Sequence, residues 1–149
     1  MKNSRRIGIG VIGLGHWGPN HVRVFRECPE AQVVICADPL SQRRRYIRRL
    51  FPDLILTEHA DEVFHHPAVE AVVIAAPADT HYEMAKRAIE AGRHVLIEKP
   101  MCTSVKEAKA LIGAARRRRL VLAHGHVFTY NPWIQFIKRG IDRGEFGRL

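Results

Sequence analysis

The sequence is poor in cysteine and has no long apolar run, and both absences exclude classes of protein. Its cysteines, Cys28, Cys36 and Cys102, form no C-x-x-C or other metal-spaced pair, so neither a disulfide framework nor a zinc site is indicated. No stretch of about 18 apolar residues is present, so no transmembrane helix is predicted. The basic start and the glycine-broken apolar residues after it lack a cleavage motif, which argues against a signal peptide. The cytoplasm is the expected location.

Acidic residues are scarce beside basic ones: 15 Asp and Glu against 24 Lys and Arg give a net charge of +9. The arginines cluster in runs at 43–45, 48–49 and 116–119. Such runs are typical either of nucleic-acid-binding surfaces or of solvated helix faces. Solvated faces are favoured, because Ile47 and Leu50 supply an apolar edge and no nucleic-acid module pattern accompanies the runs. We therefore expect no nucleic-acid partner.

The hydrophobic pattern predicts a single α/β domain. The chain has 149 residues, 46% of them hydrophobic, which suits one globular domain. Apolar β-branched runs alternate with helical patterns, as in a parallel sheet covered on both faces. The predicted strands are 7–12, 32–37, 54–56, 71–75, 94–97 and 120–123. A Rossmann-type doubly wound sheet of about six strands, ordered 3-2-1-4-5-6, is expected.

Short polar motifs predict where two of the helices begin. Thr80 with Glu83, and Ser104 with Glu107, each match a capping box, in which the hydroxyl and the carboxylate satisfy one free backbone N–H apiece. The last helix is expected from Pro132 onward.

Residues 13–18 form a G-x-G-x-x-G turn between the first strand and the first helix. Gly13 permits the tight turn, Gly15 lets the backbone approach a diphosphate, and Gly18 allows close packing of helix on strand. The diphosphate would lie on free N–H groups at the positive end of the helix. His16 and Trp17, inside the turn, are further candidates for cofactor contact. In this context the turn predicts a dinucleotide site.

Asp38 follows Gly18 by 20 residues, at the end of the second predicted strand. An acid there receives the ribose hydroxyls of NAD and repels the 2′-phosphate of NADP. The alternative is a turn former before Pro39. Arg43 and Arg44 complicate the choice, since an arginine nearby can hold a 2′-phosphate. NAD is the expected cofactor, with NADP as the alternative.

Three further segments carry a family resemblance. They are Glu98-Lys99-Pro100, the run from Ala76 to His81, and Asn131-Pro132. Together with the glycine turn, they make the chain resemble the Gfo/Idh/MocA oxidoreductases over essentially its whole length. Residues 15–20 and 125–132 are similar more narrowly to members that oxidise the 3-position of UDP-N-acetylhexosaminuronic acids.

The resemblance implies an NAD(P)-dependent enzyme acting on a sugar, a polyol or a nucleotide sugar. It carries the catalytic role over to Lys99 and cofactor contacts to Pro77, His81 and Glu98. It also implies a cis Lys99–Pro100 bond. The residues themselves are consistent with this: Lys99 follows a predicted strand, Pro100 restricts its backbone, and a partly desolvated lysine can donate to a developing alkoxide. The alternative for Lys99 is a surface side chain paired with Glu98.

His126 and Tyr130 follow the sixth predicted strand. They are candidates for substrate contact, or for packing between domains. His65 and His66 are adjacent and point apart on a helix, so no metal site is expected. The resemblance divides the chain into a dinucleotide domain, 1–128, and a connecting segment, 129–149.

Relatives in that family continue into a second, substrate-binding domain with a D-x-x-x-H acid/base histidine. The chain is therefore expected to bind cofactor but to lack a complete active site, and its longer form is expected to be a homo-oligomer. Phe128, Trp133 and Phe136 are expected to be exposed on the face toward that domain. The alternative function is a dinucleotide sensor without chemistry.

Overall fold

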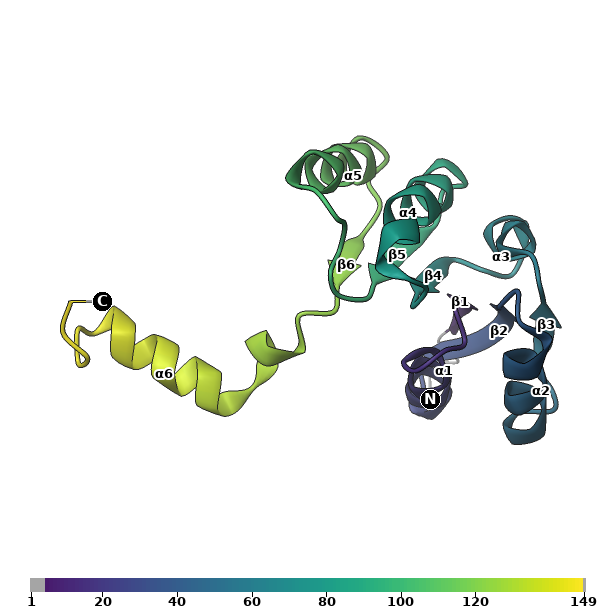
Figure 1. Cartoon of the computed structure of the whole chain (residues 1–149), viewed down its shortest axis with the longest axis horizontal. Helices are drawn as coiled ribbons and strands as arrows, with labels where there is room; N and C mark the ends of the chain where they lie inside the picture. The colour runs from purple at the N-terminus through teal and green to yellow at the C-terminus, as the bar shows by residue number, and fades with distance from the viewer. Residues whose placement is uncertain (1–4, 149) are drawn as a thin grey trace.

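The computed structural model describes residues 5–148 as a parallel sheet between two layers of helices (Figure 1). The strands are β1 (Ile7–Ile12), β2 (Ala31–Ala37), β3 (Ile55–Thr57), β4 (Ala71–Ile74), β5 (His94–Ile97) and β6 (Leu122–His124). The helices are α1 (Gly18–Glu27), α2 (Ser41–Leu50), α3 (Ala60–His65), α4 (His81–Glu90), α5 (Val105–Arg117) and α6 (Pro132–Asp142), with short 3-10 turns η1 (Ala78–Thr80) and η2 (Val127–Tyr130). The sheet order β3-β2-β1-β4-β5-β6 confirms the predicted doubly wound topology.

The apolar core has two halves, one on each face of the sheet. Helices α1 and α2 cover one face and α3, α4 and α5 the other (Figure 1). Val11, Val33 and Val73 point to the α1–α2 side, whereas Val72 and Ile74 point to the α3–α5 side. Side chains alternate across a strand, so strands covered on both faces must be apolar at successive positions. This accounts for the unbroken apolar runs of β1 and β4.

Two strands lie one or two residues later in the sequence than predicted, because their bounds are set by hydrogen bonds to the neighbouring strand. The third strand was expected at 54–56 and lies at Ile55–Thr57, because Ile35 of β2 pairs with Ile55. The sixth was expected at 120–123 and lies at Leu122–His124, because Val95 of β5 pairs with Leu122. The strand ends are therefore set by the neighbouring strand.

The capping-box prediction is wrong at Thr80 and correct in part at Ser104. Thr80 lies in η1, and its hydroxyl donates to the Pro77 carbonyl at 2.7 Å instead of accepting from the helix. The 3-10 turn brings that carbonyl into reach and leaves the hydroxyl facing away from α4. At α5, Ser104 Oγ does accept from the Glu107 N–H at 3.2 Å, but the Glu107 carboxylate bonds Thr103.

Helix α6 extends away from the sheet (Figure 1), and its neighbourhood carries exposed apolar side chains. Phe128 is 71% exposed, Trp133 75% and Phe136 54%, as expected from the sequence. Among residues 5–148, no helix is both long and apolar enough to cross a membrane.

Cys28, Cys36 and Cys102 are free thiols in the structure. Cys36 is fully buried in β2, and this burial raises the pKa of its thiol to about 12. The thiolate is the reactive form of cysteine, so Cys36 acts as a small core side chain.

Candidate functional site

The polar segments singled out in the sequence gather at the carboxyl ends of the parallel strands. The glycine turn follows β1, Asp38 follows β2, and residues 76–81 follow β4. Glu98-Lys99-Pro100 follows β5, and residues 125–130 follow β6. In open α/β sheets, ligands bind outside this edge, at the point where the strand order reverses. Here that point lies between β1 and β4, next to the glycine turn.

The three glycines of the turn differ in what a side chain would meet. At Gly13 (φ +89°) a Cβ atom would lie 2.6 Å from the Ala75 backbone, and at Gly18 it would lie 2.0 Å from the Gly13 carbonyl oxygen. At Gly15 the nearest atom would be the end of Arg43, 3.6 Å away. Gly13 and Gly18 are therefore required by packing, whereas the surface at Gly15 is open. An open backbone beside the first turn of α1 fits the approach of a diphosphate.

The Asp38 carboxylate is buried and engaged inside the protein. Its Oδ2 accepts from the Leu14 N–H at 2.8 Å and from Arg43 at 3.2 Å, and its Oδ1 accepts from the Leu40 N–H at 2.8 Å. The residue is 1% exposed. Asp38 thus ties the glycine turn to the end of β2, and Arg43 balances its charge.

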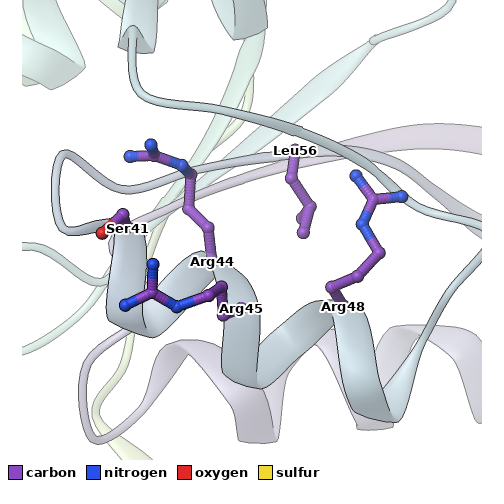
Figure 2. Close-up of a pocket in the computed structure, with 5 residues that line it drawn as sticks. All are labelled: Ser41, Arg44, Arg45, Arg48 and Leu56. Carbon is purple, nitrogen blue, oxygen red and sulfur yellow. The ribbon is translucent and has the colours of Figure 1, made fainter.

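A hollow of about 550 Å³ lies beside the turn and is lined by Leu14, Gly15, His16, Gln42, Arg43, Tyr46 and Arg49. Its cationic side chains come from α2. Figure 2 shows a second, smaller hollow between α2 and β3, lined by Ser41, Arg44, Arg45, Arg48 and Leu56. The first hollow adjoins the glycine turn and the second does not, so α2 presents arginines to two separate places.

Glu98 connects the segment after β5 to the helix after the glycine turn. Its Oε1 lies 2.8 Å from His21 Nε2 on α1, and the two side chains are 12% and 19% exposed, respectively. Its Oε2 accepts from the backbone N–H of Lys99 at 3.1 Å. The alternative considered for Lys99, a side chain paired with Glu98, is not observed, because Glu98 contacts the Lys99 backbone instead.

Lys99 itself is exposed, so the expectation of a partly desolvated lysine is not met in this chain. The Lys99–Pro100 bond is cis, as predicted. His126 and Tyr130 lie past β6 and are exposed, Tyr130 by 80%, and the His126 ring is 4.3 Å from that of His124.

The two residues assigned from the run after β4 occupy different environments. Pro77 is exposed at the start of η1, whereas His81 is 1% exposed. His81 Nδ1 lies 2.7 Å from the Pro100 carbonyl oxygen and Nε2 lies 2.9 Å from that of Ala76. Both ring nitrogens therefore face backbone, and the ring bridges the segments that follow β4 and β5.

Sequence reasoning missed His21. A signal was available, because Gly18, Val22 and Phe25 define the inward stripe of α1 at helical spacing and His21 lies on its border. A polar residue at the edge of an apolar stripe needs a partner. The partner lies 77 positions away in sequence and could not be identified from the pattern.

Comparison with known proteins agrees with this arrangement. The pattern of the Gfo/Idh/MocA oxidoreductase family, NAD-binding Rossmann fold, matches residues 7–126. The NAD(+)-dependent scyllo-inositol 2-dehydrogenase of Bacillus subtilis is 31% identical over 146 residues, 97% of this chain and 43% of that protein. UDP-N-acetylglucosamine 3-dehydrogenase of Acidithiobacillus ferrooxidans is 37% identical over 137 residues, 87% of this chain and 40% of that protein.

A solved structure shares the architecture. A variant 3-ketoreductase from Actinomadura kijaniata, in complex with TDP-benzene and NADP, superposes with a TM-score of 0.84 at 28% identity, covering 94% of this chain and 43% of that one. The chain thus spans about two fifths of the length of the curated relatives it matches. Fold, glycine turn and family match together show that the chain belongs to the Gfo/Idh/MocA oxidoreductases, as an NAD-binding Rossmann domain.

Proposed function

We propose that the chain is the cofactor-binding part of an NAD(P)-dependent dehydrogenase that oxidises a CH–OH group of a sugar, a polyol or a nucleotide sugar. In this proposal residues 1–128 form the dinucleotide domain, and residues 129–149 connect it to a substrate domain. Gly13, Gly15, His16, Trp17 and Gly18 serve the dinucleotide, and so do Asp38, Pro77, His81 and Glu98. Lys99 is the catalytic residue, with His126 and Tyr130 on the substrate side.

One observation carries the proposal: the 2.8 Å contact between His21 and Glu98. His21 lies on α1, whose first turn would receive the diphosphate, and Glu98 directly precedes Lys99. The contact holds the lysine segment against the helix of the dinucleotide turn. A hydroxyl held by Lys99 would then lie on the side of the sheet where a nicotinamide ring would be expected.

The chemistry divides between the cofactor and the side chains. The nicotinamide supplies the carbon that accepts hydride from the substrate carbinol. Lys99 donates a hydrogen bond to the hydroxyl oxygen while that oxygen loses its proton, which stabilises the developing negative charge. The resemblance implies a separate histidine in the substrate domain as the base that takes the proton.

The test is binding without turnover. The 149-residue chain is expected to bind NADH in a fluorescence titration, because the glycine turn and α1 form one local unit. It is expected to reduce no NAD with inositols or UDP-sugars, because an exposed Lys99 does not hold a substrate in place. Such positioning accounts for about 7–11 kcal/mol of barrier lowering. Absence of NADH binding would contradict the proposal. Robust turnover by this chain would contradict the assignment of substrate binding to a separate domain.

A sensor function is the second candidate. A dinucleotide sensor has no need of Lys99, whereas a dehydrogenase depends on it. If a longer form of the protein carrying Lys99→Met kept full turnover, the catalytic assignment would be wrong.

The cofactor preference is expected to depend on Arg43. NAD is proposed as the main cofactor and NADP as a second one, because Arg43 already offsets the Asp38 charge and lines the hollow beside Gly15. Arg43→Ala is expected to weaken NADP binding about tenfold relative to NAD, since a charge-assisted hydrogen bond contributes about 1.5 kcal/mol or more. Calorimetry with both dinucleotides measures the ratio.

Arg45→Ala is the matched control, because Arg45 lies on the same helix and lines the hollow of Figure 2. It is expected to leave the ratio unchanged. If Arg43→Ala also left the ratio of NADP affinity to NAD affinity unchanged, Arg43 would not bind the 2′-phosphate. Asp38 variants are a poorer test, since they also disturb the glycine turn.

We also propose a cytoplasmic location, from the free cysteines. The exposed apolar side chains Phe128, Trp133 and Phe136 support self-association of the 149-residue chain. A homo-oligomer is proposed for the longer form from the family resemblance alone. Sedimentation velocity over a range of concentrations measures it.

A further inference from the structure

We infer that His21 and His81 are positioning residues that hold the Glu98–Pro100 segment at its two ends and thereby set the direction of Lys99. The inference rests on the catalytic role proposed for Lys99. Neither histidine forms a hydrogen bond with the Lys99 side chain, and their partners are Glu98 and the Pro100 and Ala76 backbone, so each would act through the backbone on one side of Lys99.

The first contact holds the segment at Glu98. The His21 ring reaches Glu98 Oε1 through Nε2 at 2.8 Å and packs against Phe25, with ring centroids 6.5 Å apart. The other carboxylate oxygen, Oε2, accepts from the Lys99 N–H at 3.1 Å. Because one carboxylate makes both contacts, rotation of the Glu98 side chain would break both. The Lys99 backbone is thus linked to α1 through a single acid.

The second contact holds the segment at Pro100. Proline has no N–H, so its carbonyl is its only backbone hydrogen-bonding group, and this carbonyl lies 2.7 Å from His81 Nδ1. The opposite nitrogen, Nε2, lies 2.9 Å from the Ala76 carbonyl oxygen. A carbonyl can only accept, so the hydrogen bond to Pro100 requires a hydrogen on Nδ1, and the bond to Ala76 requires one on Nε2. In this inference the Nδ1–H of the buried ring donates to the Pro100 carbonyl and ties that segment to the start of α4.

Lys99 lies between the two contacts, and its own side chain does not fix its direction. Over residues 5–148, the Lys99 ammonium makes no hydrogen bond or ion pair. A free lysine side chain has about 2 kcal/mol of rotamer entropy to lose on ordering. Holding the backbone on both sides restricts the volume that the ammonium can reach, which lowers the entropy lost when it meets a substrate.

The two histidines use different ring nitrogens, which makes the inference testable by paired substitutions. A glutamine amide nitrogen stands close to the place of Nε2, and an asparagine amide nitrogen close to that of Nδ1. Gln at position 21 can therefore still donate to Glu98, whereas Asn there cannot reach it. At position 81 the order is reversed, because the contact with Pro100 uses Nδ1.

The experiment labels the lysines of the 149-residue chain with ¹⁵N and follows the backbone amide of Lys99, whose N–H donates to Glu98 Oε2. The Lys99 amide signal is assigned by its loss in Lys99→Arg, and the amides of the exposed lysines Lys106 and Lys109 of α5 are internal references. We expect the chemical shift of the Lys99 amide to be retained in His21→Gln and His81→Asn. In His21→Asn and His81→Gln it is expected to move, while the reference amides keep their positions.

Equal effects of Asn and Gln at both positions would overturn the inference, since packing alone does not distinguish the nitrogens. A second measurement covers variants that fold poorly: hydrogen exchange of the Lys99 N–H, which is bonded to Glu98. Relative to core amides of β4, exchange is expected to accelerate at least about tenfold in His21→Asn and to stay near the parent rate in His21→Gln. Equal rates in the two variants would also overturn it.

An NADH titration of the parent chain separates this inference from the proposed function. If NADH does not bind but the substitution pattern holds, the proposed function fails and the positioning contacts stand. If NADH binds and the pattern is absent, the positioning inference alone fails.

Discussion

Replacing Gly15 with valine is expected to weaken NADH binding at least about 100-fold while leaving the fold in place. The nearest atoms to an added Cβ at this position belong to the flexible end of Arg43, 3.6 Å away, so we expect the free protein to accommodate valine. A diphosphate on the first turn of α1 requires the same space. Loss of about 2.7 kcal/mol of binding free energy corresponds to the 100-fold change.

Fluorescence titration with NADH gives the affinity, and circular dichroism with a thermal scan shows whether the fold is kept. Gly113→Ala, on α5, is the control and should bind NADH like the parent. Parent-like affinity in Gly15→Val would place the dinucleotide elsewhere.

Gly18→Ala, unlike Gly15→Val, is expected to reduce the stability of the fold strongly. Its Cβ would lie 2.0 Å from the Gly13 carbonyl oxygen. Relieving this clash would require the backbone of the turn or of α1 to shift, at a large cost in free energy. Overpacking of this kind costs about 3 kcal/mol or more in the free energy of unfolding. Urea unfolding of the parent and the variant measures the difference.

Gly113→Ala is again the matched control, because it is also a glycine-to-alanine change in a helix. Among the described residues and apart from its own helix backbone, its Cβ would come near the flexible end of Arg117, at 3.2 Å. Alanine is favoured over glycine inside a helix by about 0.5–1 kcal/mol. The two variants should therefore change stability in opposite directions. A Gly18→Ala chain as stable as the parent would show that the helix does not pack on the turn as described.

The sheet order and the place of the cofactor turn were predictable from the sequence because their determinants are local. Apolar runs such as Val72 to Ile74 follow from strands buried on both faces, and the glycine turn follows β1 within a few residues. A right-handed crossover between parallel strands then leaves few possible orders. The family resemblance added Lys99 and the cis bond before Pro100.

The sequence was less reliable where a short motif has more than one partner. Thr80 with Glu83 matches a capping box, but the Pro77 carbonyl competes for the same hydroxyl. Asp38 matches an acceptor for ribose, which stays a prediction, and its oxygens also accept from Leu14, Leu40 and Arg43, which the spacing did not indicate. In each case a turn brings the additional hydrogen-bonding partner close, and the geometry of that turn cannot be predicted from the spacing of residues in the sequence.

Patterns along the chain were enough to predict the fold class, the strand order, the glycine turn and the segment that carries Lys99. The side chains that hold that segment could be identified only in the folded protein, because His21 and His81 come from α1 and from the start of α4, far from Glu98 in the chain. The fold also leaves the backbone open at Gly15 and packs it closely at Gly13 and Gly18. Periodicity and turn chemistry are properties of neighbouring residues, whereas a contact between two strand ends exists only once the sheet has formed.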